Sequence, residues 1–175
     1  MRTLSSDSQR ILRPAHPGFI ALSLFMALIL NMIPPKQWLF MPDWVLLALC
    51  FWSVRETLTM RMGHAFILGI LMDVADGAVL GQHALAYVLA SYVASGISSR
   101  ILWLPLLQQM WLMLPLFLVA TALQIFIRLM AGETFPGWAQ FNAPLVTALL
   151  WPPANILLLL PQFQPDERDE NRPIN

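Results

Sequence analysis

Long apolar runs separated by short polar segments are the dominant pattern of this chain of 175 residues. Each run approaches or exceeds the 17 to 25 mostly apolar residues that a bilayer-spanning helix needs. The runs cover residues 17–33, about 38–54, 62–79, 83–99, 101–127 and 143–160. The pattern predicts an all-α integral membrane protein, a compact bundle of about six transmembrane helices.

The breaks between the runs are charged or rich in proline and glycine. Pro34-Pro35-Lys36 ends the first run, charged residues within 55–61 follow the second, and a glycine-rich turn at 77–81 joins the third and fourth. Pro105 and Pro115 interrupt the fifth run, which is tolerable inside a helical bundle. Pro105 can instead mark the start of that helix.

Both ends of the chain are polar. We expect residues 1–16 to form a cytoplasmic segment, 17–161 a single transmembrane domain and 162–175 an acidic, disordered cytoplasmic tail. The first run also resembles a signal peptide in its basic start, but it is long for one and no A-x-A site follows.

The positive charges favour an orientation, because short loops rich in Lys and Arg stay in the cytoplasm. With six spans and both termini inside, eight of the ten cations lie on the cytoplasmic side and only Lys36 and Arg128 lie outside. A five-span alternative merges the third and fourth runs into a re-entrant hairpin and weakens this bias. We therefore expect a multi-pass protein with both termini cytoplasmic.

Composition agrees with a membrane protein. The chain is 58% hydrophobic and 11% charged, and its mean hydropathy is +0.63, which is too apolar for a soluble domain of this length. Membrane lipid is therefore an expected partner. A net charge of zero argues against a nucleic-acid partner. The lone cysteine, Cys50, has no intramolecular disulfide partner.

One acid, Asp73, lies within the third apolar run. A charge at bilayer depth costs several kcal/mol unless protein or water shelters it, so Asp73 should face protein and marks a functional position. It shares a four-residue ridge with small residues, namely Ala65, Gly69, Gly77 and Gly81. As a structural residue, Asp73 is expected either to accept hydrogen bonds from a serine of the fourth run or from Tyr92, or to be protonated. As a functional residue it would carry protons or bind a partner helix.

The fourth run carries a second ridge of small residues. They recur every four positions and are Ala86, Ala90, Ala94 and Ser98. Small residues allow close approach of helices in a membrane. The third and fourth runs should pack tightly as a hairpin, and the same faces are candidates for contact with another chain.

Catalytic and metal-binding patterns are scarce. Asp73 and Asp76 lie on adjacent turns of one helix, which does not give the geometry of an aspartyl enzyme. No Walker loop, H-E-x-x-H or C-x-x-C occurs, and each of the three histidines is interpreted as an interfacial residue at a segment start. His83 with Asp76 supplies too few ligands for a metal site. We expect no enzymatic activity, no cofactor and no metal.

Several of these residues together resemble the rod shape-determining protein MreD family of bacteria. The matching positions are Pro42-Asp43-Trp44, then Gly63, Phe66, Gly69, Asp73, Gly77, Leu80-Gly81 and Ala84-Leu85, with Tyr92 later. Chain length and six spans also match, and the similarity covers nearly the whole chain. The tail after Pro161 matches no pattern of the family.

The resemblance implies a noncatalytic scaffold in the bacterial inner membrane that acts in cell elongation. Its principal partner would be MreC, within an assembly that includes MreB, RodA and a class B penicillin-binding transpeptidase of peptidoglycan synthesis. Asp43 and Asp73 would be positioning residues. Asp73→Leu should then disrupt folding or partner binding, and Asp73→Asn should be milder.

The competing interpretation is a substrate-binding subunit of an energy-coupling vitamin transporter, which has similar length and about six spans. Such a subunit needs several convergent polar side chains around a pocket. The outer half of this chain offers few: Asp73, Asp76, Gln82, Gln124 and Asn142. That shortage favours the scaffold.

Overall fold

The computed structural model describes residues 15–33, 41–57, 60 and 62–162, and this part of the chain contains helices and turns but no strand. The elements are α1 (Pro17–Met32), α2 (Trp44–Arg55), α3 (Met62–Asp76), α4 (Gln82–Gly96), α5 (Ser98–Leu102), α6 (Leu106–Met130), η2 (Trp138–Phe141), α7 (Asn142–Leu149), α8 (Trp151–Leu159) and η3 (Leu160–Gln162). The predicted terminal segments, apart from residues 15–16 and 162, lie outside the described residues, as does the start of the second run.

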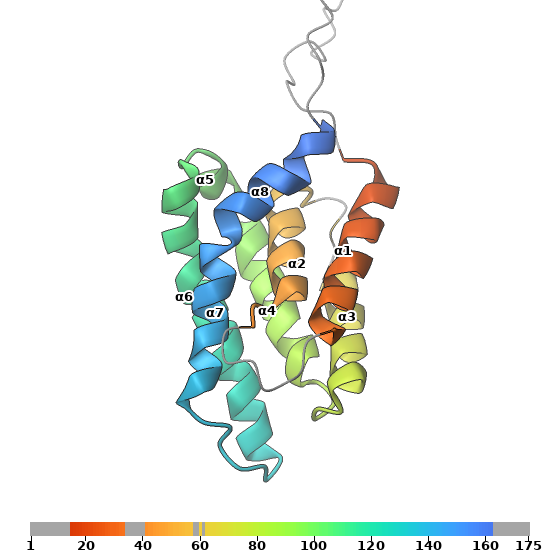
Figure 1. Ribbon diagram of the computed structural model, residues 1–175, viewed down its shortest axis with the longest axis vertical. Helices are drawn as coiled ribbons and strands as arrows, with labels where there is room; N and C mark the ends of the chain where they lie inside the picture. The colour runs from red at the N-terminus through yellow and green to blue at the C-terminus, as the bar shows by residue number, and fades with distance from the viewer. Residues whose placement is uncertain (1–14, 34–40, 58–59, 61, 163–175) are drawn as a thin grey trace, which may run out of the picture.

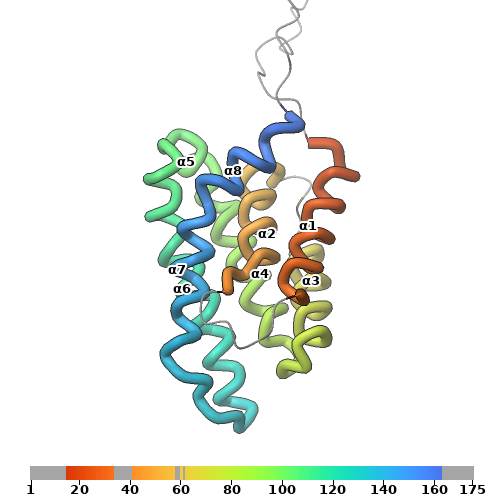
Figure 2. Tube along the Cα trace, viewed as in Figure 1, coloured from red at the N-terminus to blue at the C-terminus, as the bar shows by residue number. Residues whose placement is uncertain are grey.

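The long helices run up and down one bundle (Figure 1). In chain order α1, α2, α3, α4 and α6 alternate in direction, and α7 with α8 returns to the end where α1 begins. The tube in Figure 2 shows that the start of α1 and the end of α8 lie side by side at this same end. The α3–α4 turn and the loop after α6 lie at the opposite end, which we call the turn end of the bundle.

The second helix, α2, forms the centre of the bundle. All side chains from Val45 to Val54 are buried, as expected for a helix that is apolar all round. Its polar groups are paired: the Trp52 indole N–H donates to Ser23 Oγ of α1 at 2.8 Å, and Ser53 Oγ lies 2.7 Å from Ser91 Oγ of α4. These hydrogen bonds tie α2 to helices on two sides.

The last apolar run is not one helix. It divides into α7 and α8 at Leu150, and the segments Trp138–Leu149 and Trp151–Gln162 that contain them are bent by 43°. Pro152 and Pro153 explain the break, because proline lacks the N–H that would bond to the preceding turn and its ring clashes with the carbonyl four residues earlier. Both prolines fit within the first turn of α8, where no such N–H is required.

Only α6 is both long and apolar enough to cross a membrane as a single helix in the described part of the chain. The bent pair 138–149 and 151–162 passes the same test when its two helices are counted together. α1 and α2 are apolar but shorter, with 16 and 12 residues.

Candidate functional site

Asp43 joins four helices at the turn end. Its carboxylate caps α2 by accepting the Leu46 N–H at 2.9 Å, and it also accepts hydrogen bonds from Asn31 Nδ2 of α1 and the Tyr87 hydroxyl of α4 at 3.1 and 2.9 Å. The Asp43 backbone N–H donates to Thr147 Oγ1 of α7 at 2.9 Å. A residue that begins one helix therefore fixes that helix against three others.

Asp73 holds the turn between α3 and α4. Its side chain is fully buried, so it faces protein as expected. The backbone N–H groups of Gly81 and His83 each donate to its carboxylate at 2.8 Å, and His83 Nδ1 lies 2.8 Å from Oδ1. The expected donors are wrong: Tyr92 is 58% exposed, and the partners of Asp73 come from the turn and the first residues of α4.

His83 is therefore more than an interfacial residue. Besides its contact with Asp73, its Nε2 lies 3.9 Å from Asp76 Oδ2, and its ring meets the Tyr87 ring edge-on at 5.8 Å between centroids. Tyr87 in turn donates to Asp43. His83 therefore links the turn held by Asp73 to the group of residues bonded to Asp43, namely Asn31, Tyr87 and Thr147, which we call the Asp43 junction.

Close packing of α3 on α4 depends on Gly69. A Cβ atom built on Gly69 would lie 2.3 Å from Ala84 Cα and 2.5 Å from Ala84 N, so only glycine fits. Gly77 and Gly81 belong to the turn and have φ of 60° and 98°, a region that favours glycine. The predicted tight hairpin is confirmed, with Ala84 facing Gly69.

The other predicted contact residues divide between interior and surface. Pro42, Ala65, Ala86, Ala90 and Ala94 are buried within the bundle. The faces that carry the four alanines are filled by this chain's own helices and are not free grooves. Ser98 begins the short helix α5 and is half-buried.

Gly63, Phe66 and Tyr92 remain exposed on the outside of the α3–α4 hairpin. Of the predicted contact residues, these and Gly77, which is exposed in the turn, are the ones that another chain can reach without opening the bundle.

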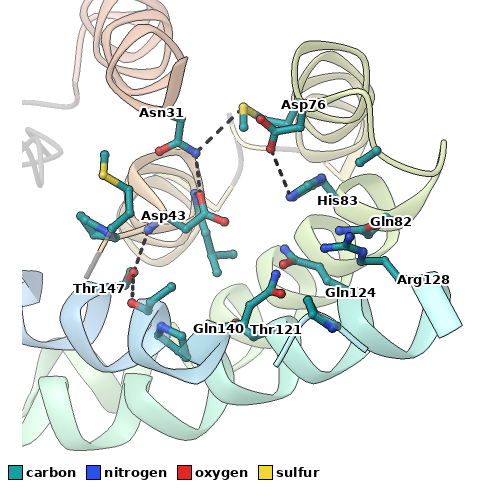
Figure 3. Close-up of a pocket in the computed structure, with 18 of the residues that line it drawn as sticks. Asn31, Asp43, Asp76, Gln82, His83, Thr121, Gln124, Arg128, Gln140 and Thr147 are labelled. Carbon is teal, nitrogen blue, oxygen red and sulfur yellow. Dashed lines mark hydrogen bonds and ion pairs between the residues drawn. The ribbon is translucent and has the colours of Figure 1, made fainter. Parts of the chain in front are cut away.

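A cavity of about 560 Å³ opens at the turn end (Figure 3). Its labelled polar lining residues are Asn31, Asp43, Asp76, Gln82, His83, Thr121, Gln124, Arg128, Gln140 and Thr147. The expected shortage of polar groups is thus wrong, although Asp73 and Asn142 are not among the lining residues. The described residues contain no group of three or more His, Cys, Asp or Glu that could hold a metal ion.

Sequence reasoning missed Asn31, Tyr87 and Thr147 as parts of the Asp43 junction. One signal was present: His83, Tyr87 and Ser91 recur every four residues and form a polar stripe beside the alanine ridge of α4. Nothing comparable marks Asn31 or Thr147, which lie singly in apolar runs.

Together, these features define an apolar helical membrane protein in which two acids, Asp43 and Asp73, hold helices and a turn together at one end of the bundle. The family model of the rod shape-determining protein MreD matches residues 13–160. The rod shape-determining protein MreD of Haemophilus influenzae is 30% identical over 141 residues, which cover 77% of this chain and 85% of the relative. No solved structure matches. This chain belongs to the MreD family of rod shape-determining membrane proteins.

Proposed function

We propose that this chain is a noncatalytic scaffold of the cell elongation machinery, and that it maintains rod shape by binding MreC and helping to organise peptidoglycan synthesis with MreB, RodA and a class B penicillin-binding transpeptidase. The main support for the proposal is the hydrogen bonding of the Asp43 and Asp73 carboxylates. Each carboxylate accepts hydrogen bonds that fix helices or a turn, which suits a rigid contact surface.

We further propose six membrane crossings with both termini in the cytoplasm of the bacterial inner membrane. The alternating helix directions in Figure 1 support an even number of crossings. A hydrogen bond from Ala15 N to Glu56 Oε1, at 3.1 Å, also places the start of α1 beside the end of α2. The turn end then lies on the outer side.

The contact surface for MreC is proposed to be the outer face of the α3–α4 hairpin. Leu85, Leu89 and Tyr92 recur on one exposed stripe of α4, and Ile67 and Leu71 are exposed on α3. The buried alanine ridge cannot serve, because a partner helix would have to displace α2 or α6. A single-span partner can pack on the exposed stripe without such a change.

Site-specific photocrosslinking in the native membrane tests this assignment. A photoreactive phenylalanine analogue at Tyr92 should crosslink to MreC, and tagged wild-type chain should copurify MreC with elongation enzymes. The same analogue at Phe25, an equally exposed aromatic position on α1, is the matched control. Crosslinks from Phe25 and none from Tyr92 would contradict the proposed face.

The cavity at the turn end favours one second candidate, a substrate-binding subunit of a vitamin-type energy-coupling transporter. A volume of about 560 Å³ lies in the range of small-molecule sites. Copurification of ATPase and transporter subunits in place of MreC, together with loss of vitamin uptake on deletion, would establish this candidate and reject the scaffold.

A further inference from the structure

The charged side chains at the cavity are largely paired within the chain. Arg128 Nε lies 2.9 Å from Glu133 Oε2, and the Asp43 carboxylate accepts hydrogen bonds from Asn31 and Tyr87. These charged groups therefore have partners within the protein and need none from a ligand. A charged ligand would have to compete with these pairs, so the arrangement favours a neutral one.

Gln82 is different, because part of its side chain has no partner. The residue is 2% exposed and lines the cavity from the start of α4, and its Oε1 is buried without a hydrogen bond in the described structure. Buried carbonyl oxygens are normally paired, so Gln82 Oε1 is an unmet hydrogen-bond acceptor on a residue that borders the cavity.

Further amide and hydroxyl groups lie around Gln82. Figure 3 shows Thr121 and Gln124 of α6 and Gln140 of η2 on the same side of the cavity. Thr121 and Gln124 are themselves buried. Amides and hydroxyls offer both donors and acceptors, as the hydroxyl groups of a ligand require.

Apolar side chains from several elements complete the lining, and they include Met41, Pro42, Leu46, Met72, Pro136 and Pro144. A saccharide ring combines hydroxyl groups at its edge with C–H groups on its faces, so it can contact both the polar and the apolar lining residues. We propose that this cavity binds a neutral, hydroxyl-rich group of saccharide type, whose hydroxyl groups pair with the amide and hydroxyl side chains of Gln82, Thr121, Gln124 and Gln140.

The same chemistry has two sources, a free saccharide and the glycosyl headgroup of a lipid. The test uses the full chain in phosphatidylethanolamine–phosphatidylglycerol nanodiscs, prepared without sugar-based detergents because these would occupy the site. N-acetylglucosamine and glucose are titrated in solution, and monoglucosyl diacylglycerol is compared with plain diacylglycerol in the bilayer. The readout is the unfolding midpoint, Tm.

At least one sugar-bearing probe should raise Tm in a saturable way. Gln82→Met should weaken that binding at least about tenfold, yet raise the Tm of the ligand-free protein by about 2–4 °C because the unpaired oxygen is gone. Thr121→Val should also weaken binding and serves as the second variant if Gln82→Met does not fold. A response to the soluble sugars assigns a free saccharide, and a response to the glycolipid alone assigns a headgroup.

Gln108→Met is the matched control, since Gln108 is exposed on α6 and does not line the cavity. It should change neither binding nor Tm. Absence of any saturable shift, or equal shifts in wild type, Gln82→Met and Thr121→Val, would overturn the proposal and leave water as the occupant. The scaffold proposal does not depend on this result, because crosslinking to MreC is measured separately.

Discussion

At the scale of single residues, polar groups in this protein act by joining helices. Asp43 is the clearest case, because its side chain caps α2 and also accepts hydrogen bonds from Tyr87 and Asn31 of other helices. Hydrogen bonds to a charged group are worth more than neutral ones, about 1.5–3 kcal/mol each. Loss of a donor to Asp43 should therefore lower the free energy of unfolding more than loss of a hydrogen bond between neutral groups.

Tyr87→Phe tests this point. Removing the hydroxyl deletes the hydrogen bond to Asp43 and leaves the ring in place, so we expect a loss of about 2 kcal/mol in the free energy of unfolding. Denaturant unfolding in one fixed detergent measures it. Tyr92→Phe, at an exposed position, should change stability by less than about 0.5 kcal/mol. Equal losses in the two variants would show that the Asp43 contact is unimportant.

Asp73 gives the second residue-scale prediction. Asp73→Leu removes the acceptor for two part-buried backbone N–H groups, at Gly81 and His83, and should cost about 3 kcal/mol. Asp73→Asn keeps one oxygen and should cost roughly half as much. The variants are compared by unfolding and by hydrogen exchange at these two amides. Equal cost in both would mean that the negative charge itself is required.

At the scale of elements, the two helices of the α3–α4 hairpin are packed with their backbones in close contact. Gly69 lets the backbones of the two helices approach, and the Asp73 carboxylate fixes the turn one helical turn further on. Because both features act on the same pair of helices, the hairpin should move as a rigid unit. A partner bound on its outer face would then be held in a defined orientation.

Gly69→Ala should damage this packing, because the added Cβ would overlap the backbone at Ala84 and the helices must move apart. We expect a loss of about 1–3 kcal/mol. Gly63→Ala lies in the same helix with open space around the new methyl group, and it should be neutral or stabilising by about 0.5–1 kcal/mol. The two variants are compared with the wild type by thermal unfolding. A stable Gly69→Ala protein would contradict the observed approach of the helices.

At the scale of the whole molecule, the helices are arranged so that one end of the bundle carries the cavity and both acid-centred contacts. The other end carries the start of α1 and the end of α8 (Figure 2). If six crossings hold, the polar cavity faces the outer side of the membrane and the termini face the cytoplasm.

Cysteine labelling tests this topology. Cys50 is fully buried and can be replaced by alanine to give a silent background. Thr57→Cys and Thr134→Cys then place single thiols in exposed loops of the described structure. A membrane-impermeant maleimide should label position 134 in intact cells with an opened outer membrane, and position 57 only after lysis. Labelling of both positions on the same side would favour the five-span alternative.

The sequence by itself determined the membrane class, the approximate helices and the burial of Asp73. These follow from local quantities: the length of apolar runs, the places of proline and glycine, and the cost of a charge in hydrocarbon. Gly77 and Gly81, for example, marked the hairpin turn, which the structure confirms.

Only the tertiary structure decided which helices face one another. Small residues at every fourth position show that one face of a helix allows close packing. Which helix packs on that face depends on how the whole chain folds. For that reason the alanine ridge of α4 proved internal, His83 became the partner of Asp73, and polar residues distant in sequence met around one cavity. Convergence of Asn31, Asp43, Tyr87 and Thr147 has no local signature, because it is set by the positions of four helices at once.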